Sequence, residues 1–160
     1  MAQPSVVVVF NSRCGATETL AHAAAVGTVN ARTLPRLRRL PDDEGAVEPA
    51  CAETLRRLQK EYVAPTEADV VGSQGLIIVP SAAMTAGSPA WAPFMALLER
   101  LSATGALAGK VVAVVGTGEA QMASFSAAFA ARGVALLSSD GRDARAHGRA
   151  VGEAVRGVPL

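Results

Sequence analysis

The sequence is poor in three features whose abundance usually marks a specialised protein: cysteine, aromatic residues and net charge. Its 160 residues include two cysteines and 4% aromatic residues, and the formal net charge is +1. Two cysteines are too few for a disulfide scaffold or a four-cysteine zinc site. A charge so close to zero argues against a protein that coats nucleic acid or an anionic membrane. We therefore expect no nucleic-acid partner.

Long hydrophobic runs are also missing. The apolar run at 6–10 is too short for a signal-peptide core or a membrane span, and residues 1–5 lack the basic region of a signal peptide. We expect a cytoplasmic protein with no membrane partner. Half of the residues are hydrophobic and 18% are charged, which excludes global disorder. The length suits a single domain over residues 1–160.

Apolar runs alternate along the chain with helical patterns. Strands are predicted at 6–10, 28–34, 75–80, 110–115 and 134–137. Helices are predicted at 16–26, 49–62, 88–101, 121–131 and 142–155, with loops at 36–48 and 65–69. Gly27 is expected to end the first helix, and Ser88 to cap the third. Continuous β-branched runs are typical of parallel strands covered on both faces. The order predicts an α/β fold, a doubly wound five-stranded parallel sheet with helices on both faces.

The loop after the first strand contains residues that suit a phosphate. In such sheets ligands bind at the carboxyl ends of the strands. Ser12 and Thr17 bracket Gly15 there, between a strand and the start of a helix, where unpaired N–H groups favour an anion. No Gly-Lys-Ser/Thr or G-x-G-x-x-G pattern is present. The alternative is an ordinary strand-to-helix turn in which the Ser and the Thr only cap the helix.

Three motifs resemble the tryptophan-repressor-binding-protein-like family of the flavodoxin superfamily. They are Ser12-x-x-Gly15-x-x-Glu18-Thr19, Ala68-Asp69 followed by Gly75-Leu-Ile-Ile-Val-Pro80-Ser81, and Gly105-Ala-Leu-Ala-Gly-Lys110. The resemblance runs from about Val6 to Leu137. It implies the flavodoxin-like fold, flavin mononucleotide (FMN) as cofactor and NAD(P)H:quinone oxidoreductase activity.

The resemblance also implies which residues hold the FMN. The phosphate would be held by Ser12, Arg13, Cys14, Gly15, Ala16 and Thr17. The ring would be edged by Pro80, Ser81, Ala82, Ala83, Met84 and Thr85 on one side and by Gly116, Thr117 and Gly118 on the other. The flavin carries the chemistry, so no protein acid or base is expected to be catalytic. Ala82 and Ala83 stand where the family has an arginine and an aromatic residue.

Several other residues have a structural and a functional interpretation. Trp91 either packs a helix against the sheet, which we favour, or stacks on a ligand. Arg36, Arg38 and Arg39 either face solvent, which we favour, or bind an NADPH phosphate. The carboxylates at 42–44 are expected in a solvated turn. Cys14 is either a small loop residue or a reactive thiol beside a helix N-terminus. The two histidines have no ligand partner at metal spacing, so no metal site is expected.

The sequence therefore predicts an FMN-dependent oxidoreductase, with NAD(P)H as electron donor and a small-molecule quinone as acceptor. The first alternative is a one-electron carrier of the flavodoxin type, which usually docks through a strongly acidic face. The second is a non-catalytic flavodoxin-like domain with weak or lost flavin binding. A homodimer or homotetramer is expected, with the apolar stretch 82–95 as a candidate contact surface.

Overall fold

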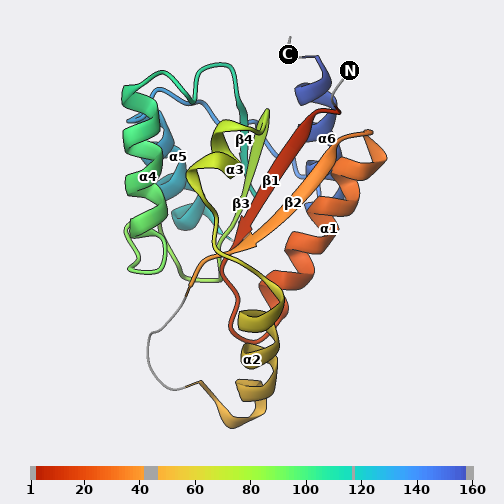
Figure 1. Cartoon of the computed structure of the whole chain (residues 1–160), viewed down its shortest axis with the longest axis vertical. Helices are drawn as coiled ribbons and strands as arrows, with labels where there is room; N and C mark the ends of the chain where they lie inside the picture. Colours follow the sequence, from red (N-terminus) through yellow and green to blue (C-terminus); the bar gives the residue numbers. More distant parts are fainter. Residues whose placement is uncertain (1–2, 42–46, 117, 158–160) are drawn as a thin grey trace.

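A four-stranded parallel sheet forms the centre of the protein. The computed structural model describes residues 3–41, 47–116 and 118–157. The strands are β1 (Ser5–Phe10), β2 (Leu34–Arg39), β3 (Gly75–Val79) and β4 (Val111–Val114). Their order across the sheet is β2-β1-β3-β4, with every pair parallel. Figure 1 shows the strands side by side with helices on both sides.

The predicted fifth strand is the main difference from the expected sheet. Residues 134–137 contribute a single parallel bridge, between Leu136 and Val112. Neither end of this segment continues the hydrogen bonding to β4. The N–H of Val134 still donates to Phe129 at the end of the preceding helix, and Ser138 already begins a turn with Asp140. The prediction of five strands was therefore wrong by one, although the segment lies where a fifth strand would.

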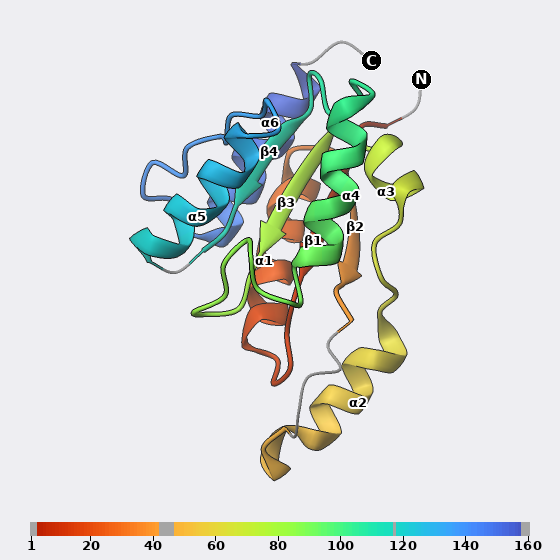
Figure 2. The same cartoon turned by 90° about the vertical axis from the view of Figure 1, so that its left-hand side faces the viewer.

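Helices cover both faces of the sheet. On one face lie α1 (Ala16–Asn30) and α6 (Ala144–Arg156), and on the other lie α4 (Ala92–Ala103) and α5 (Glu119–Ala130) (Figures 1 and 2). Alternate strand residues enter two separate cores: Val7 and Val9 pack under α4 and α5, and Val6 and Val8 pack under α1 and α6. Burial on both faces explains the uninterrupted apolar strands.

Two glycines allow α1 and α6 to cross closely. A Cβ on Gly27 would overlap the backbone carbonyl of Arg145, and a Cβ on Gly148 would overlap that of Ala24. Gly27 is therefore an interior packing residue of a helix that continues to Asn30. The expectation that it ends the helix was wrong. Because α1 takes residues 28–30, the second strand begins only at Leu34 and occupies part of the predicted loop.

The remaining helices also differ in detail from the predictions. The predicted helix at 49–62 is a short 3-10 turn (Pro49–Cys51) followed by α2 (Ala52–Glu61). The predicted break at 65–69 contains α3 (Glu67–Val71), whose start is closed by reciprocal hydrogen bonds between Thr66 and Asp69. Among the described residues, no helix combines the length and apolar character that a membrane crossing requires.

Trp91 confirms the packing interpretation. Its side chain is fully buried and makes edge contacts with Phe94 and Phe125, at centroid distances of 6.2 and 5.4 Å. The chain before it forms a turn, in which the Ser88 hydroxyl accepts a hydrogen bond from the Thr85 N–H, so α4 begins later than predicted. The large apolar side chains of the stretch 82–95 thus lie in the core rather than on a contact surface.

Candidate functional site

The predicted phosphate loop and the loop after β3 meet at one edge of the sheet. They line a pocket of about 290 Å³. Its walls are Asn11, Ser12, Arg13, Cys14, Ala16, Thr17, Ser81, Ala82 and Met84. The two loops follow neighbouring parallel strands, β1 and β3, so their carboxyl ends lie side by side. The topology therefore brings together two of the three segments that the sequence indicated.

The start of α1 is open toward this loop. Gly15 is the N-cap residue, with φ +98°, and no side chain caps the helix. The Ser12 hydroxyl accepts a hydrogen bond from the Gly15 N–H at 3.1 Å, so it orders the loop instead of capping the first turn. The Ser and the Thr therefore do not cap the helix, while the choice between a phosphate site and an ordinary strand-to-helix turn stays a prediction. The first-turn N–H groups and the positive end of the helix dipole are thus available to an anion.

A hydroxyl and amide network joins the two loops. The Thr17 hydroxyl donates to the Ser81 hydroxyl at 3.4 Å, and Ser81 donates to the carbonyl or side-chain oxygen of Asn11 at 2.6 or 2.9 Å. Asn11 is fully buried, and its amide nitrogen has no hydrogen-bond partner among the described residues. An unsatisfied buried donor is costly, and a ligand oxygen in this pocket would satisfy it. Asn11 lines this pocket, and the prediction did not include it among the cofactor-binding residues.

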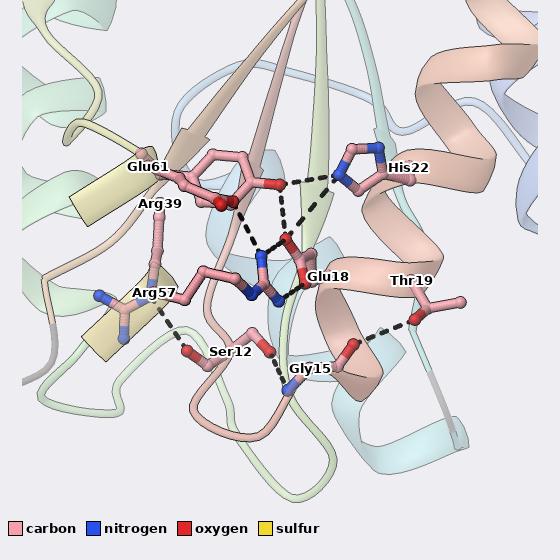
Figure 3. Close-up of polar contacts among 9 residues, drawn as sticks. Ser12, Gly15, Glu18, Thr19, His22, Arg39, Arg57 and Glu61 are labelled. Carbon is pink, nitrogen blue, oxygen red and sulfur yellow. Dashed lines mark hydrogen bonds and ion pairs between the residues drawn. The ribbon is translucent and has the colours of Figure 1, made fainter. Parts of the chain in front are cut away.

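Arg36, Arg38 and Arg39, the basic residues of β2, lie in three different environments. Arg36 is exposed, as expected, but Arg38 makes a two-point ion pair with Asp69, at 2.9 and 3.1 Å. Arg39 is 5% exposed and donates to the Ser12 carbonyl at 3.0 Å (Figure 3). The solvated interpretation was therefore wrong for Arg38 and Arg39. Arg39 is the last residue of β2 and pairs with Phe10 at the end of β1, so the sheet places its positive charge against the phosphate loop.

A buried carboxylate in the first turn of α1 is neutralised by α2. Glu18 is 9% exposed and accepts two hydrogen bonds from Arg57, at 2.7 and 3.1 Å. Tyr62 donates to the same carboxylate at 2.6 Å, and His22 contacts the Tyr62 hydroxyl at 2.7 Å. Figure 3 shows Arg57 and His22 on either side of Glu18. Hydrogen bonding to Arg57 outweighs burial and holds the pKa of Glu18 below its usual value. This pairing removes a charge that would otherwise repel an anion at the same helix end.

A disulfide fixes the phosphate loop to the start of α2. Cys14 and Cys51 are bonded, with their Cα atoms 5.0 Å apart and a sequence separation of 37 positions. The alternative of a free, reactive Cys14 thiol is therefore wrong for this structure. The spacing of the two cysteines carries no signal for the pairing, because α2 approaches the loop only in the folded chain. Disulfides are rare in cytosolic proteins, so this bond argues against the expected cytoplasmic location. The location itself stays a prediction.

The residues predicted around the ring are small and partly exposed. Ala82, Ala83 and Thr85 are exposed at the tip of the loop after β3, and Met84 is half-buried. The side-chain amide of Gln121 donates to the carbonyls of Ser81 and Met84, at 2.8 and 2.9 Å.

Gln121 also connects this loop to the segment after β4. A Cβ on Gly116 would meet the Gln121 side-chain oxygen at 2.7 Å, so the segment after β4 packs directly on that side chain. Gly118, with φ +118°, is the N-cap residue of α5. Thr117 and the carboxylates at 42–44 lie outside the described residues. Pro80 directly follows β3 and is buried.

No metal centre is formed by the part of the chain that the structure describes, where no three His, Cys, Asp or Glu residues gather. His22 belongs to the Glu18 network. His147 lies on α6 in a separate pocket.

Comparison with solved structures identifies the fold. A WrbA-like flavodoxin from Agrobacterium tumefaciens superposes with a TM-score of 0.66 at 17% identity, covering 98% of this chain and 100% of that one. The two-electron reduced flavodoxin of Megasphaera elsdenii gives 0.65 at 16% identity, covering 92% and 98%. A flavodoxin from Streptococcus pneumoniae TIGR4 gives 0.61 at 17%, covering 96% and 99%. No family profile and no curated protein matches the sequence.

These likenesses show that the chain has the flavodoxin-like fold. They extend over nearly the whole of each chain, so the fold resemblance drawn from the sequence motifs is confirmed. At identities of 17% and below they show the fold and not the activity.

Proposed function

We propose that this protein binds FMN and works as an NAD(P)H:quinone oxidoreductase. The observation that supports FMN as the cofactor is the pocket at the start of α1, where an uncapped helix end, the Thr17 hydroxyl and the unpaired Asn11 amide converge. This donor set suits a phosphate, so the residues present fit the phosphate end of FMN. When bound, FMN accepts a hydride and passes on two electrons.

The chain's own residues would position the cofactor. The Gly15 backbone, with no Cβ, lets the loop approach a phosphate closely, while Ser12 and the disulfide hold the loop in shape. Arg39 behind the loop also holds it in place by donating to the Ser12 carbonyl. The small side chains of Ala82 and Ala83 leave the ring without a stacking partner from this loop. We therefore expect the phosphate to supply an unusually large share of the affinity.

The second candidate is a one-electron carrier, since all three similar structures described above are flavodoxins. The formal net charge of +1 favours the reductase, because carriers usually dock through a strongly acidic face. A homodimer or homotetramer stays part of the proposal, although the stretch 82–95 offers mostly small side chains at its surface.

Absorbance spectroscopy and stopped-flow reduction test the proposal. The protein should take up FMN, be reduced by NADPH or NADH, and then reduce a soluble quinone in repeated turnovers. Reduction in two separate one-electron steps with no quinone turnover would favour the carrier. A protein that takes up no FMN would contradict both and support a non-catalytic domain.

A further inference from the structure

A second pocket lies at the carboxyl end of β4, on the α1 and α6 side of the sheet. Its volume is about 300 Å³. Residues from α1, β4, α5 and α6 line it, among them Leu20, Val115, Gly116, Met122, Arg142 and His147. The walls are largely aliphatic, and the polar groups come from the start of α6. The pocket shares no lining residue with the phosphate pocket. It shares Gly116, in the segment after β4, with the predicted ring site.

His147 is the unusual member of this pocket. Its side chain is 2% exposed, yet neither ring nitrogen has a hydrogen-bond partner among the described residues. Buried polar groups are almost always hydrogen-bonded, because an unpaired one keeps the full cost of its desolvation. A replacement by an apolar residue would avoid that cost, so a histidine here indicates a partner that the chain itself does not supply.

The charges around the pocket favour an uncharged ligand. Burial, with help from the charge of Arg142, lowers the pKa of His147 against an opposing effect of Asp140, so the imidazole is neutral at neutral pH. Arg142 is itself ion-paired with Asp140 at 3.5 Å. Asp143 accepts a hydrogen bond from the Ala146 N–H at 2.8 Å as the N-cap of α6. The positive charge is thus already balanced, and an anion gains little here.

We propose that this pocket binds the electron acceptor, an aromatic quinone, and that His147 hydrogen-bonds to its carbonyl oxygen. A neutral imidazole has one N–H donor and one acceptor nitrogen. It can donate to a quinone carbonyl and accept from the hydroxyl of the hydroquinone product, so it serves both oxidation states. The aliphatic walls suit the ring, and Gly116 places one side of the pocket at the segment predicted to border the flavin.

This inference rests on the proposed reductase function. In the net reaction the quinone gains two electrons and two protons and becomes a hydroquinone. NAD(P)H is the two-electron donor and becomes NAD(P)⁺, and solvent supplies the second proton. FMN held by the phosphate loop would carry the electrons between the two.

Ligand titrations followed by NMR test the site on the intact chain. The probe is 2,3-dimethyl-1,4-naphthoquinone, which has no free ring position for thiol addition, and 2,3-dimethylnaphthalene is its oxygen-free analogue. The variant is His147→Phe, which keeps an aromatic ring but removes both nitrogens. The control is Arg100→Phe, which introduces the same ring at an exposed position of α4 outside the lining of both pockets.

In the wild type the quinone should shift the ring nitrogen signals of His147 and the amide signal of Gly116. One lost hydrogen bond should weaken quinone binding by about threefold to tenfold in His147→Phe. Naphthalene binding should not change, and Arg100→Phe should behave as the wild type. Quinone-induced shifts confined to other residues, or equal quinone affinity in His147→Phe, would overturn the assignment, and the wild-type spectra decide this even if the variant misfolds.

Separate flavin measurements distinguish this inference from the proposed function. FMN affinity and reduction of the bound FMN by NADPH should be the same in all three proteins, while the KM for the quinone rises only in His147→Phe. Normal reduction with a quinone KM independent of His147 would remove the inference and leave the reductase. Quinone binding at His147 in a protein that takes up no FMN would remove the reductase and leave the site.

Discussion

Removing the phosphate from the cofactor should reveal how this protein holds FMN. In the pocket at the start of α1, the Asn11 amide and the first-turn N–H groups can donate to a phosphate, and so can the Thr17 hydroxyl once its hydrogen turns from Ser81. Riboflavin has no phosphate to accept these bonds. A hydrogen bond to a charged group is worth about 1.5–3 kcal/mol. The loss of two such bonds is about 3–6 kcal/mol, and every 1.4 kcal/mol is about tenfold. Riboflavin should therefore bind at least about a hundredfold more weakly than FMN.

Thr17→Val gives a sharper version of this test. The substitution keeps the shape of the side chain and removes its hydroxyl, so FMN affinity should fall by about tenfold or more while riboflavin affinity stays the same. Gly15→Glu would be a poorer choice, because φ +98° strains any side chain at that position. Thr104→Val, at the far end of α4, is the matched control and should bind both flavins normally.

Fluorescence quenching during titration of the apoprotein measures both dissociation constants. Equal affinity for FMN and riboflavin, or an equal loss for both flavins in Thr17→Val, would refute the assignment of the phosphate site.

Three other predictions concern the frame that supports the site. Cys51→Ser opens the loop that the disulfide closes over 37 positions, and it should lower the free energy of unfolding by about 4 kcal/mol in urea titrations. Reduction of the wild-type disulfide should lower that free energy by the same amount. Gly148→Ala forces a methyl group into the Ala24 carbonyl and should cost about 1–3 kcal/mol, while Gly157→Ala, which has room for its Cβ, should be nearly neutral in thermal melts. The pKa of Glu18 is lowered on folding, so the carboxylate contributes to stability at a pH above its usual pKa of 4.5, and this contribution is lost as the pH falls further. Glu18→Gln should flatten that loss of stability in acid. An unchanged pH profile in this variant would contradict the pairing with Arg57.

The local signals in the sequence were enough for the strands that lie at the centre of the sheet. Val6–Phe10 and Gly75–Val79 are continuous apolar runs, and their burial on both faces leaves no other arrangement for so many β-branched and aliphatic side chains. The phosphate loop was also visible, because it follows directly from a buried strand into a helix and the necessary residues are adjacent in the chain. Motifs formed by neighbours need no tertiary information.

Features formed by distant segments were decided only by the tertiary structure. Leu34–Arg39 has a weak strand pattern and becomes β2 because it pairs along the whole of β1. Gly27 resembles a helix end in sequence, but the close crossing with α6 makes it an interior residue. The bond between Cys14 and Cys51 and the contact of Arg39 with the phosphate loop depend on how α2 and β2 reach that edge of the sheet. No local pattern records such approaches, because each depends on the packing of the whole chain.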